Sequence, residues 1–159
     1  MELKKFIQNL EGKWFVQRTS HIACSGESQT VRGDALVNLN NFGRGKIVSP
    51  FKPEECPVSL KLNHYSCGNC LYSSMLIFLP IKEMQDSAKV MKLSEKNELI
   101  IGHCCIDKLG TMHISFSYED NFIEERIWFA SKNLKLTITI INKQGVLQYS
   151  SFASEIRLR

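Results

Sequence analysis

The feature that most constrains the fold of this chain is an alternation of apolar and polar residues. From Lys13 onward the pattern has a period of two, which is the period of a β-strand with one buried face. The clearest segments are 134–140, where leucine and isoleucine alternate with lysine and threonine, and 112–116. We therefore expect the apolar residues of both segments to face a core.

Comparable alternating segments follow one another along the chain with short polar turns between them. They lie near residues 13–21, 29–39, 58–63, 71–79, 88–93, 98–106, 121–130 and 146–157. Connections this short leave no room for crossover helices, so about ten antiparallel strands are predicted. A sheet with so many strands usually closes on itself to remove its edges. We therefore predict an all-β, up-and-down barrel and favour it over a sandwich.

The first residues have a different period. Leu3, Phe6, Ile7 and Leu10 lie on one stripe of a short helix, which Gly12 is placed to end. With 159 residues the chain has the length of one domain. The prediction is a single domain over 1–159, with a capping helix in 1–11 and the barrel in 13–158. The irregular segment 40–57 is expected to form a long loop over one mouth.

Composition excludes several classes of function. The net charge of +4 is small and is not gathered into basic runs, which argues against nucleic-acid binding. The longest apolar run, 75–79, is far shorter than the roughly 20 residues of a membrane span, and the first residues resemble no secretion signal. We expect a soluble intracellular protein whose six cysteines are reduced thiols.

Two predicted strands place aromatic and charged side chains on one face. These faces consist of Trp14, Val16, Arg18 and Ser20 in the first strand, and of Phe122, Glu124, Arg126 and Trp128 in the strand at 121–130. One interpretation is a site inside the barrel that binds a flat, apolar, anionic ligand. The other is that Arg18 and Arg126 form ion pairs at the surface with Glu124 or Glu125.

The triplet Gly12-Lys13-Trp14 resembles the Gly-x-Trp motif of lipocalin-type barrels. In such barrels the tryptophan closes one end and packs against an arginine from the far end of the chain, for which Arg157 is the candidate. Both residues are then structural.

The cysteines and histidines permit a zinc site. Cys67-x-x-Cys70 with His64 supplies half of one, and His103-Cys104-Cys105 the rest. Adjacent residues of a strand point to opposite faces, however, so Cys104 and Cys105 do not easily bind one ion. We therefore favour buried or idle thiols and predict no metal.

Nucleophilic catalysis has weak support. His21 and Cys24 end the first strand, where a nucleophile and a base are conceivable, but no third residue completes a triad. The usual hydrolase and phosphate-binding motifs are absent from the sequence.

Three blocks resemble the S-type phycobiliprotein chromophore lyases. They are residues 11–21 (EGKWFVQRTSH), 124–134 (EERIWFASKNL) and 151–157 (SFASEIR). The chain departs from that family at Ile22, where a second histidine is common, and at Lys135 and Thr137, where arginines are common. Members of that family also tend to carry a tryptophan in the middle region. This chain has tryptophan only at positions 14 and 128, so the resemblance assigns the stacking role to Tyr65, Tyr72 or Phe78.

The resemblance implies a lipocalin-like barrel that binds a linear tetrapyrrole (a bilin) and promotes its thioether attachment to a cysteine of an apo-phycobiliprotein. Bilin propionates require cations, for which Arg18, Arg126 and Lys135 are candidates. Glu124 or Glu125 would accept the pyrrole N–H groups and Trp128 would contact the ring plane. Of the two carboxylates we prefer Glu124, because it shares a face with Arg126 and Trp128. The predicted catalytic residues are Arg18, His21 and Glu124.

The resemblance also implies the partners. The bilin, phycoerythrobilin or phycocyanobilin, is then a substrate, and no permanent cofactor is expected. The acceptor is an apo-phycobiliprotein, with the β subunit favoured, and a homodimer is compatible with the sequence. The compartment is a cyanobacterial cytoplasm or a plastid stroma. A lipocalin-like carrier of a bilin or fatty acid, which protects its ligand without transferring it, is the alternative function, and a zinc-stabilised binding module is a third.

Overall fold

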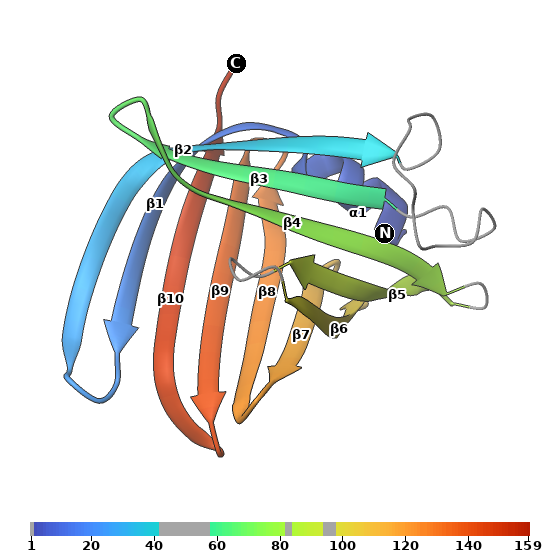
Figure 1. Cartoon of the computed structure of the whole chain (residues 1–159). Helices are drawn as coiled ribbons and strands as arrows, with labels where there is room; N and C mark the ends of the chain where they lie inside the picture. The colour runs from blue at the N-terminus through green and yellow to red at the C-terminus, as the bar shows by residue number, and fades with distance from the viewer. Residues whose placement is uncertain (1, 42–57, 82–83, 94–97) are drawn as a thin grey trace.

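The computed structural model describes residues 2–41, 58–81, 84–93 and 98–159. In this part of the chain it contains one helix and ten strands (Figure 1). They are α1 (Leu3–Leu10), β1 (Gly12–Ile22), β2 (Glu27–Asn41), β3 (Val58–Ser66), β4 (Asn69–Ile81), β5 (Met84–Leu93), β6 (Leu99–Ile106), β7 (Met112–Tyr118), β8 (Asn121–Ser131), β9 (Leu134–Lys143) and β10 (Val146–Arg157).

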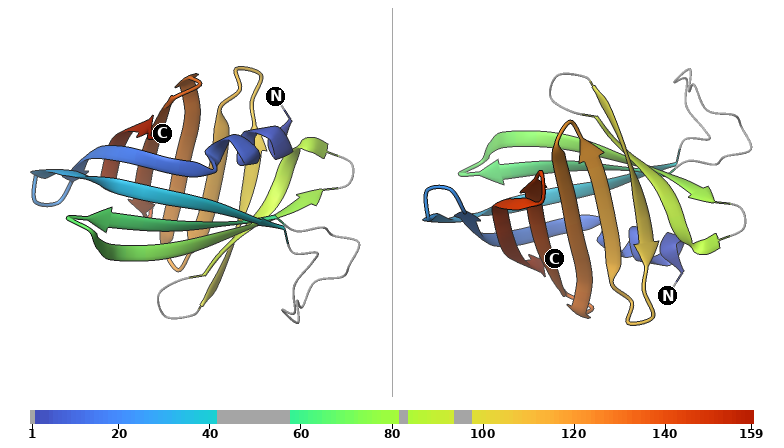
Figure 2. Two further views of the ribbon diagram at one scale, coloured as in Figure 1. Left: turned by 90° about the horizontal axis from the view of Figure 1, so that it is seen from above. Right: turned by 90° about the horizontal axis from the view of Figure 1, so that it is seen from below.

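The strands form a closed antiparallel barrel, as predicted. Each strand pairs with its neighbours in the chain, and β1 also pairs with β10, which closes the ring. Figure 2 shows the sheet curving round on itself when it is viewed from above and from below. Two of the turns, at Cys67-Gly68 and Gln144-Gly145, have positive φ at both residues. Such turns match the twist of the flanking strands and favour tight hairpins over crossovers.

The apolar stripe of α1 plugs the barrel. Leu3, Phe6, Ile7 and Leu10 are all buried, which confirms the expected helix face. The ring of Phe6 packs against Phe129 of β8 with 5.1 Å between centroids. The helix therefore closes part of the core that the strands alone would leave open.

Trp14 and Arg157 close the same end, as predicted. The Arg157 guanidinium lies 4.2 Å from the centre of the fully buried Trp14 ring. Its two terminal nitrogens donate to the carbonyl oxygens of Glu11 and Asn9, each at 2.6 Å. The Trp14 indole N–H donates to the Leu10 carbonyl at 2.9 Å. These bonds satisfy carbonyls that the end of a helix leaves without partners.

The expected orientation of β9 is wrong. Lys135 and Thr137 are buried, whereas the leucine and isoleucine side chains that alternate with them face outward and are only partly buried. The reason is a carboxylate on the neighbouring strand, Glu155, which binds both polar side chains inside the barrel. In β7 the apolar residues Met112, Ile114 and Phe116 are buried as predicted.

Most of the predicted loop at 40–57 lies outside the described residues, since β2 extends to Asn41. No helix in the described ranges has the length and apolar character to cross a membrane.

Candidate ligand-binding site

The barrel encloses a cavity of about 140 Å³ with a mixed lining. Its apolar wall comes from residues such as Leu60, Leu62, Leu76, Phe78 and Ile114. The polar side chains that reach it are Arg18, His64, Ser74, Lys92, Glu125, Lys135, Thr137 and Glu155. A cavity with this lining suits a ligand that is largely apolar and carries anionic groups.

Arg18 is the strongest candidate for a ligand-binding residue of the cavity. It lies on the inner face of β1, where its buried Nε has no hydrogen-bond partner in the described part of the structure. Buried donors are nearly always paired, so an orphaned one is unusual. An anion bound beside Arg18 would supply the missing acceptor through a charge-assisted hydrogen bond.

Lys135 faces the interior, but its charge is already compensated. Its ammonium lies 2.8 Å from a carboxylate oxygen of Glu155 and 4.7 Å from the centre of the Trp14 ring. The Thr137 hydroxyl donates to the other Glu155 oxygen at 2.9 Å. This arrangement satisfies Lys135 without a ligand, so it supports a structural role more directly than the predicted role in propionate binding.

Lys92 of β5 and His64 of β3 also line the cavity; from the sequence, His64 was considered only as a zinc ligand and Lys92 was not considered. Burial, followed by the positive charge of Arg18, lowers the pKa of His64 from its ordinary 6.5 to about 4. The imidazole is therefore neutral at pH 7, where it can donate one hydrogen bond and accept another.

The lowered pKa of His64 predicts a pH-dependent stability. Between about pH 6.5 and 4 the unfolded chain binds a proton at His64 that the folded chain does not. The free energy of unfolding therefore rises with pH across this interval, by at most about 1.4 kcal/mol per pH unit for one proton. Urea unfolding of wild type and His64→Asn at pH 4.5, 5.5 and 7 measures this contribution.

We expect His64→Asn to flatten that slope. The control is His21→Asn, which removes an exposed histidine from the outer face of the same barrel and should leave the slope unchanged. A wild-type slope in His64→Asn would show that this histidine is not the group that resists protonation.

The preference for Glu124 as the inward carboxylate is wrong, because Glu125 lines the cavity instead. In β8 the residues that join the core are Ile123, Ile127 and Phe129, and Glu125 shares their face. Glu124, together with Arg126 and Trp128, therefore lies on the other face of the strand. Phe129, 6.2 Å from Trp14, takes the place inside the barrel that was expected of Trp128.

The remaining predicted site residues lie outside the cavity that Arg18 lines. Glu124 and Arg126 line a separate hollow of about 160 Å³ on the outside, with His113. His21 is exposed and lies within hydrogen-bond distance of the Ser28 hydroxyl, 3.2 Å away. Of the three predicted catalytic residues, only Arg18 therefore faces the cavity.

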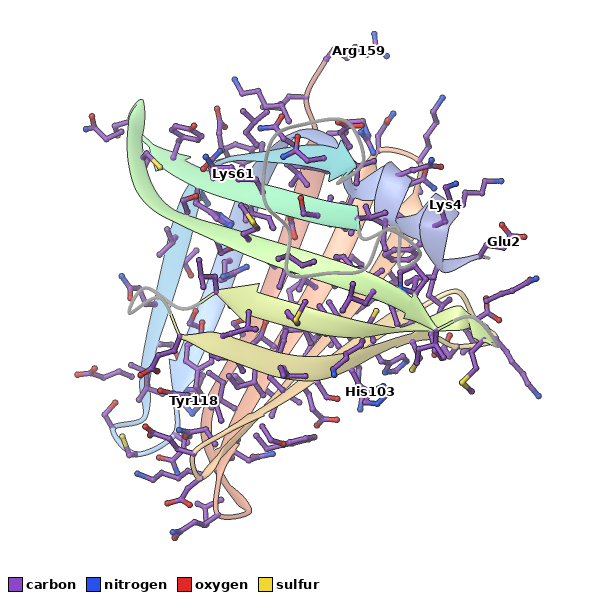
Figure 3. All side chains as sticks on the ribbon, turned by 45° about the vertical axis from the view of Figure 1, so that its right-hand side comes forward. Glu2, Lys4, Lys61, His103, Tyr118 and Arg159 are labelled. Carbon is purple, nitrogen blue, oxygen red and sulfur yellow. The ribbon has the colours of Figure 1, made fainter. Side chains whose placement is uncertain are left out.

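The zinc arrangement considered above does not form among the described residues, where no group of three or more suitable ligands comes together. Cys104 points into the core, and burial raises its pKa to about 12. Cys105 is exposed on the opposite face, and Cys67 lies at the tip of the β3–β4 hairpin. Figure 3 shows His103 projecting from the outside of the barrel.

Among the proposed stacking residues, Phe78 lines the cavity, whereas Tyr65 does not and lies between a smaller inner hollow and a groove on the outer face. The side chain of Tyr72 lies outside the described residues. Glu155 is the most informative residue that sequence reasoning missed. The sequence could have indicated its position, because Glu155 lies in the block 151–157. It shares a strand face with Ser151 and Ala153, which are both buried.

Comparison with known proteins identifies the family of this chain. Residues 68–158, more than half of the chain, match the model of a family described as CpeS-like protein. A chromophore lyase CpcS/CpeS from Thermosynechococcus vestitus is 24% identical, over 99% of this chain and 93% of its own length. A homologue from the alga Pyropia yezoensis is 21% identical over 98% of each chain.

A solved structure has the same fold. It is the S-type phycobiliprotein lyase CPES from Guillardia theta, which superposes with a TM-score of 0.78. It is 20% identical, and the match covers all of this chain and 94% of the other. With the family model covering the strands from the β3–β4 turn to β10, this chain belongs to the CpeS-like protein family.

Proposed function

We propose that this protein is a phycobiliprotein lyase, which binds a linear tetrapyrrole in its barrel and promotes its thioether attachment to a cysteine of an apo-phycobiliprotein. The observation that carries the proposal is the buried, unpartnered Nε of Arg18 beside a largely apolar cavity. The names of the relatives, chromophore lyases of several cyanobacteria and an alga, support the same activity.

The cavity side chains suit the chemistry of a bilin. Arg18 and Lys92 supply cations for two propionates, and Glu125 supplies an acceptor for pyrrole N–H groups. Phe78 provides an aromatic surface for the ring system. Here Lys92 and Glu125 take over roles that the sequence analysis gave to Lys135 and Glu124.

The bilin does not fit in this cavity alone. Pockets that bind drug-sized ligands have volumes of about 300–1,000 Å³. Even the smallest of these is about twice the volume of this cavity. A second hollow of about 200 Å³ adjoins it and is also lined by Arg18 and His64. We infer that the bilin extends from the cavity into this hollow, which leaves one end of the ligand near the surface.

The protein then acts by positioning. The acceptor thiol adds across the carbon–carbon double bond of the bilin ethylidene group. Sulfur bonds to the exocyclic carbon of that double bond and the proton is transferred to the ring carbon, so the addition has no leaving group. Holding the bilin in one conformation reduces the entropy lost when the thiol approaches. His21 and Glu124 face away from the cavity, so we assign no proton transfer to them.

A reconstitution assay tests the proposal. The protein is incubated with phycocyanobilin or phycoerythrobilin and an apo-phycobiliprotein β subunit, and the acceptor is then examined on a denaturing gel. A lyase gives covalent colour at one cysteine, faster than the mixture without it. A coloured complex that never transfers its bilin would identify the protein as a carrier. We expect transfer under the reducing conditions of a cyanobacterial cytoplasm or plastid stroma.

A further inference from the structure

Part of one edge of β2, beside the ligand cavity, has no partner strand among the described strands. On that side β2 pairs with β3 only from Asp34, which lies opposite Tyr65, to Asn41. Residues 27–33 have no β3 partner, because β3 ends at Ser66 and the chain turns back into β4. Figure 1 shows the tip of this hairpin extending past β2 at the upper left.

Gly33 marks the point where the two strands separate. A Cβ atom at this position would lie 2.2 Å from the carbonyl oxygen of Tyr65, closer than packed atoms allow. Only glycine therefore lets β3 cross so near to β2. The crossing brings Tyr65 to the boundary between the inside and the outside of the barrel.

Hollows lie on both sides of this edge and share lining residues, which suggests a path from the cavity to the outer face. The 200 Å³ hollow inside the barrel shares Arg18 and His64 with the central cavity. It also shares Arg32 and Tyr65 with a larger groove on the outer face. A ligand that extends out of the cavity therefore reaches the edge of β2 where the outer groove begins.

The outer groove has the properties of a protein-docking surface. It has a volume of about 710 Å³, and we call it the Phe15 groove after its most exposed aromatic residue. Its main side chains are Lys13, Phe15, Arg32, Leu36, Tyr65 and Cys67. Aromatic side chains next to an arginine are typical of the residues that dominate protein interfaces.

The groove also carries one uncompensated charge. Lys13 forms an ion pair with Asp34 at 3.4 Å, which balances both groups. Arg32 has no ion pair within the described ranges of the chain, so the groove is positive by about one charge. A complementary partner presents an apolar or aromatic side chain with a carboxylate next to it.

We propose that the Phe15 groove is the docking surface for the acceptor phycobiliprotein. This inference rests on the proposed function and adds the surface at which transfer takes place. A lyase must bring the acceptor cysteine to the exposed end of its ligand, and the groove begins where the path from the cavity ends. A second copy of this chain in the groove would instead block that exit, so the acceptor is the occupant that the geometry favours.

Two substitutions test the docking surface. Phe15→Ser removes the exposed aromatic ring, and Lys13→Glu reverses a positive charge of the groove; neither side chain lines the central cavity or the hollow that adjoins it. The matched control is Phe122→Ser, because Phe122 is 41% exposed and Phe15 is 37% exposed, but Phe122 lies on β8 away from the groove. Circular dichroism melts confirm that each variant is folded.

The readouts separate docking from bilin binding. We expect both groove variants to bind free bilin with wild-type affinity and an unchanged absorption spectrum. They should require at least about 10-fold more acceptor for half-maximal transfer, as loss of a dominant interface residue does. Phe122→Ser should match wild type in both measurements.

Several results would overturn the inference. Groove variants that transfer bilin with a wild-type dependence on acceptor concentration would exclude this surface, as would an equal loss in Phe122→Ser. A fall in mass from dimer to monomer in sedimentation of Phe15→Ser, with transfer intact, would assign the groove to a second copy. Failure of the wild-type protein to bind any bilin is a separate result, which would refute the proposed function itself.

Discussion

Lys135→Ala is expected to lower the free energy of unfolding by about 3–5 kcal/mol, the cost of leaving one member of a buried ion pair alone. Lys135 and its partner Glu155 are 4% and 6% exposed. Without the ammonium, the carboxylate keeps only the Thr137 hydroxyl as a bonding partner.

Urea unfolding at pH 7 measures the effect. Lys13→Ala breaks the exposed pair with Asp34 and is the control, with an expected cost below about 1 kcal/mol. The double variant Lys135→Met with Glu155→Leu should recover most of the loss, because apolar residues of similar volume replace both charges. A cost for Lys135→Ala as small as that of Lys13→Ala would show that the barrel tolerates the Glu155 carboxylate without its partner.

Arg18→Ala is expected to weaken bilin binding by about 10- to 100-fold. Hydrogen bonds to charged groups contribute about 1.5–3 kcal/mol, which corresponds to that range. The side chain reaches both the cavity and the adjoining hollow, so one substitution removes a cation from the whole length of the proposed ligand path. Removing a cation with an unsatisfied donor costs the empty protein little, so its stability should hardly change.

The matched control is Arg126→Ala, which removes the same side chain from the outer face of β8. An absorption titration with free bilin compares the two variants. We expect Arg126→Ala to bind like wild type, since its side chain lines the outer hollow with Glu124. Equal losses in both variants, or a loss only in Arg126→Ala, would place the ligand outside the cavity described here.

Together these variants separate two kinds of buried charge. Lys135 and Glu155 compensate each other and hold the end of the barrel, whereas Arg18 retains a donor without an acceptor. Removing one member of a buried pair leaves the other charge uncompensated, whereas a buried donor that lacks a partner is available to a ligand. Affinity should therefore depend on Arg18 and stability on Lys135, although both side chains line the same cavity.

The local pattern of the sequence determined the architecture. A period of two with short turns leads to antiparallel neighbours, and closure follows because a long sheet avoids free edges. The same reasoning predicted the buried stripe of the helix correctly. It also placed Arg18 on the same strand face as Trp14, and this face points into the barrel because Trp14 closes its end. The contact between Trp14 and Arg157 followed from a motif at one end of the chain and one arginine at the other.

Only the tertiary structure decided which face of β8 and β9 points inward. Alternation separates the two faces of a strand, but both faces of β8 carry large apolar residues, Trp128 on one and Phe129 on the other. In β9 the polar face is the buried one, because Glu155 on the next strand compensates Lys135. A buried charge is stable only beside its partner, and that proximity is created by the pairing of strands, which no period within a single strand encodes.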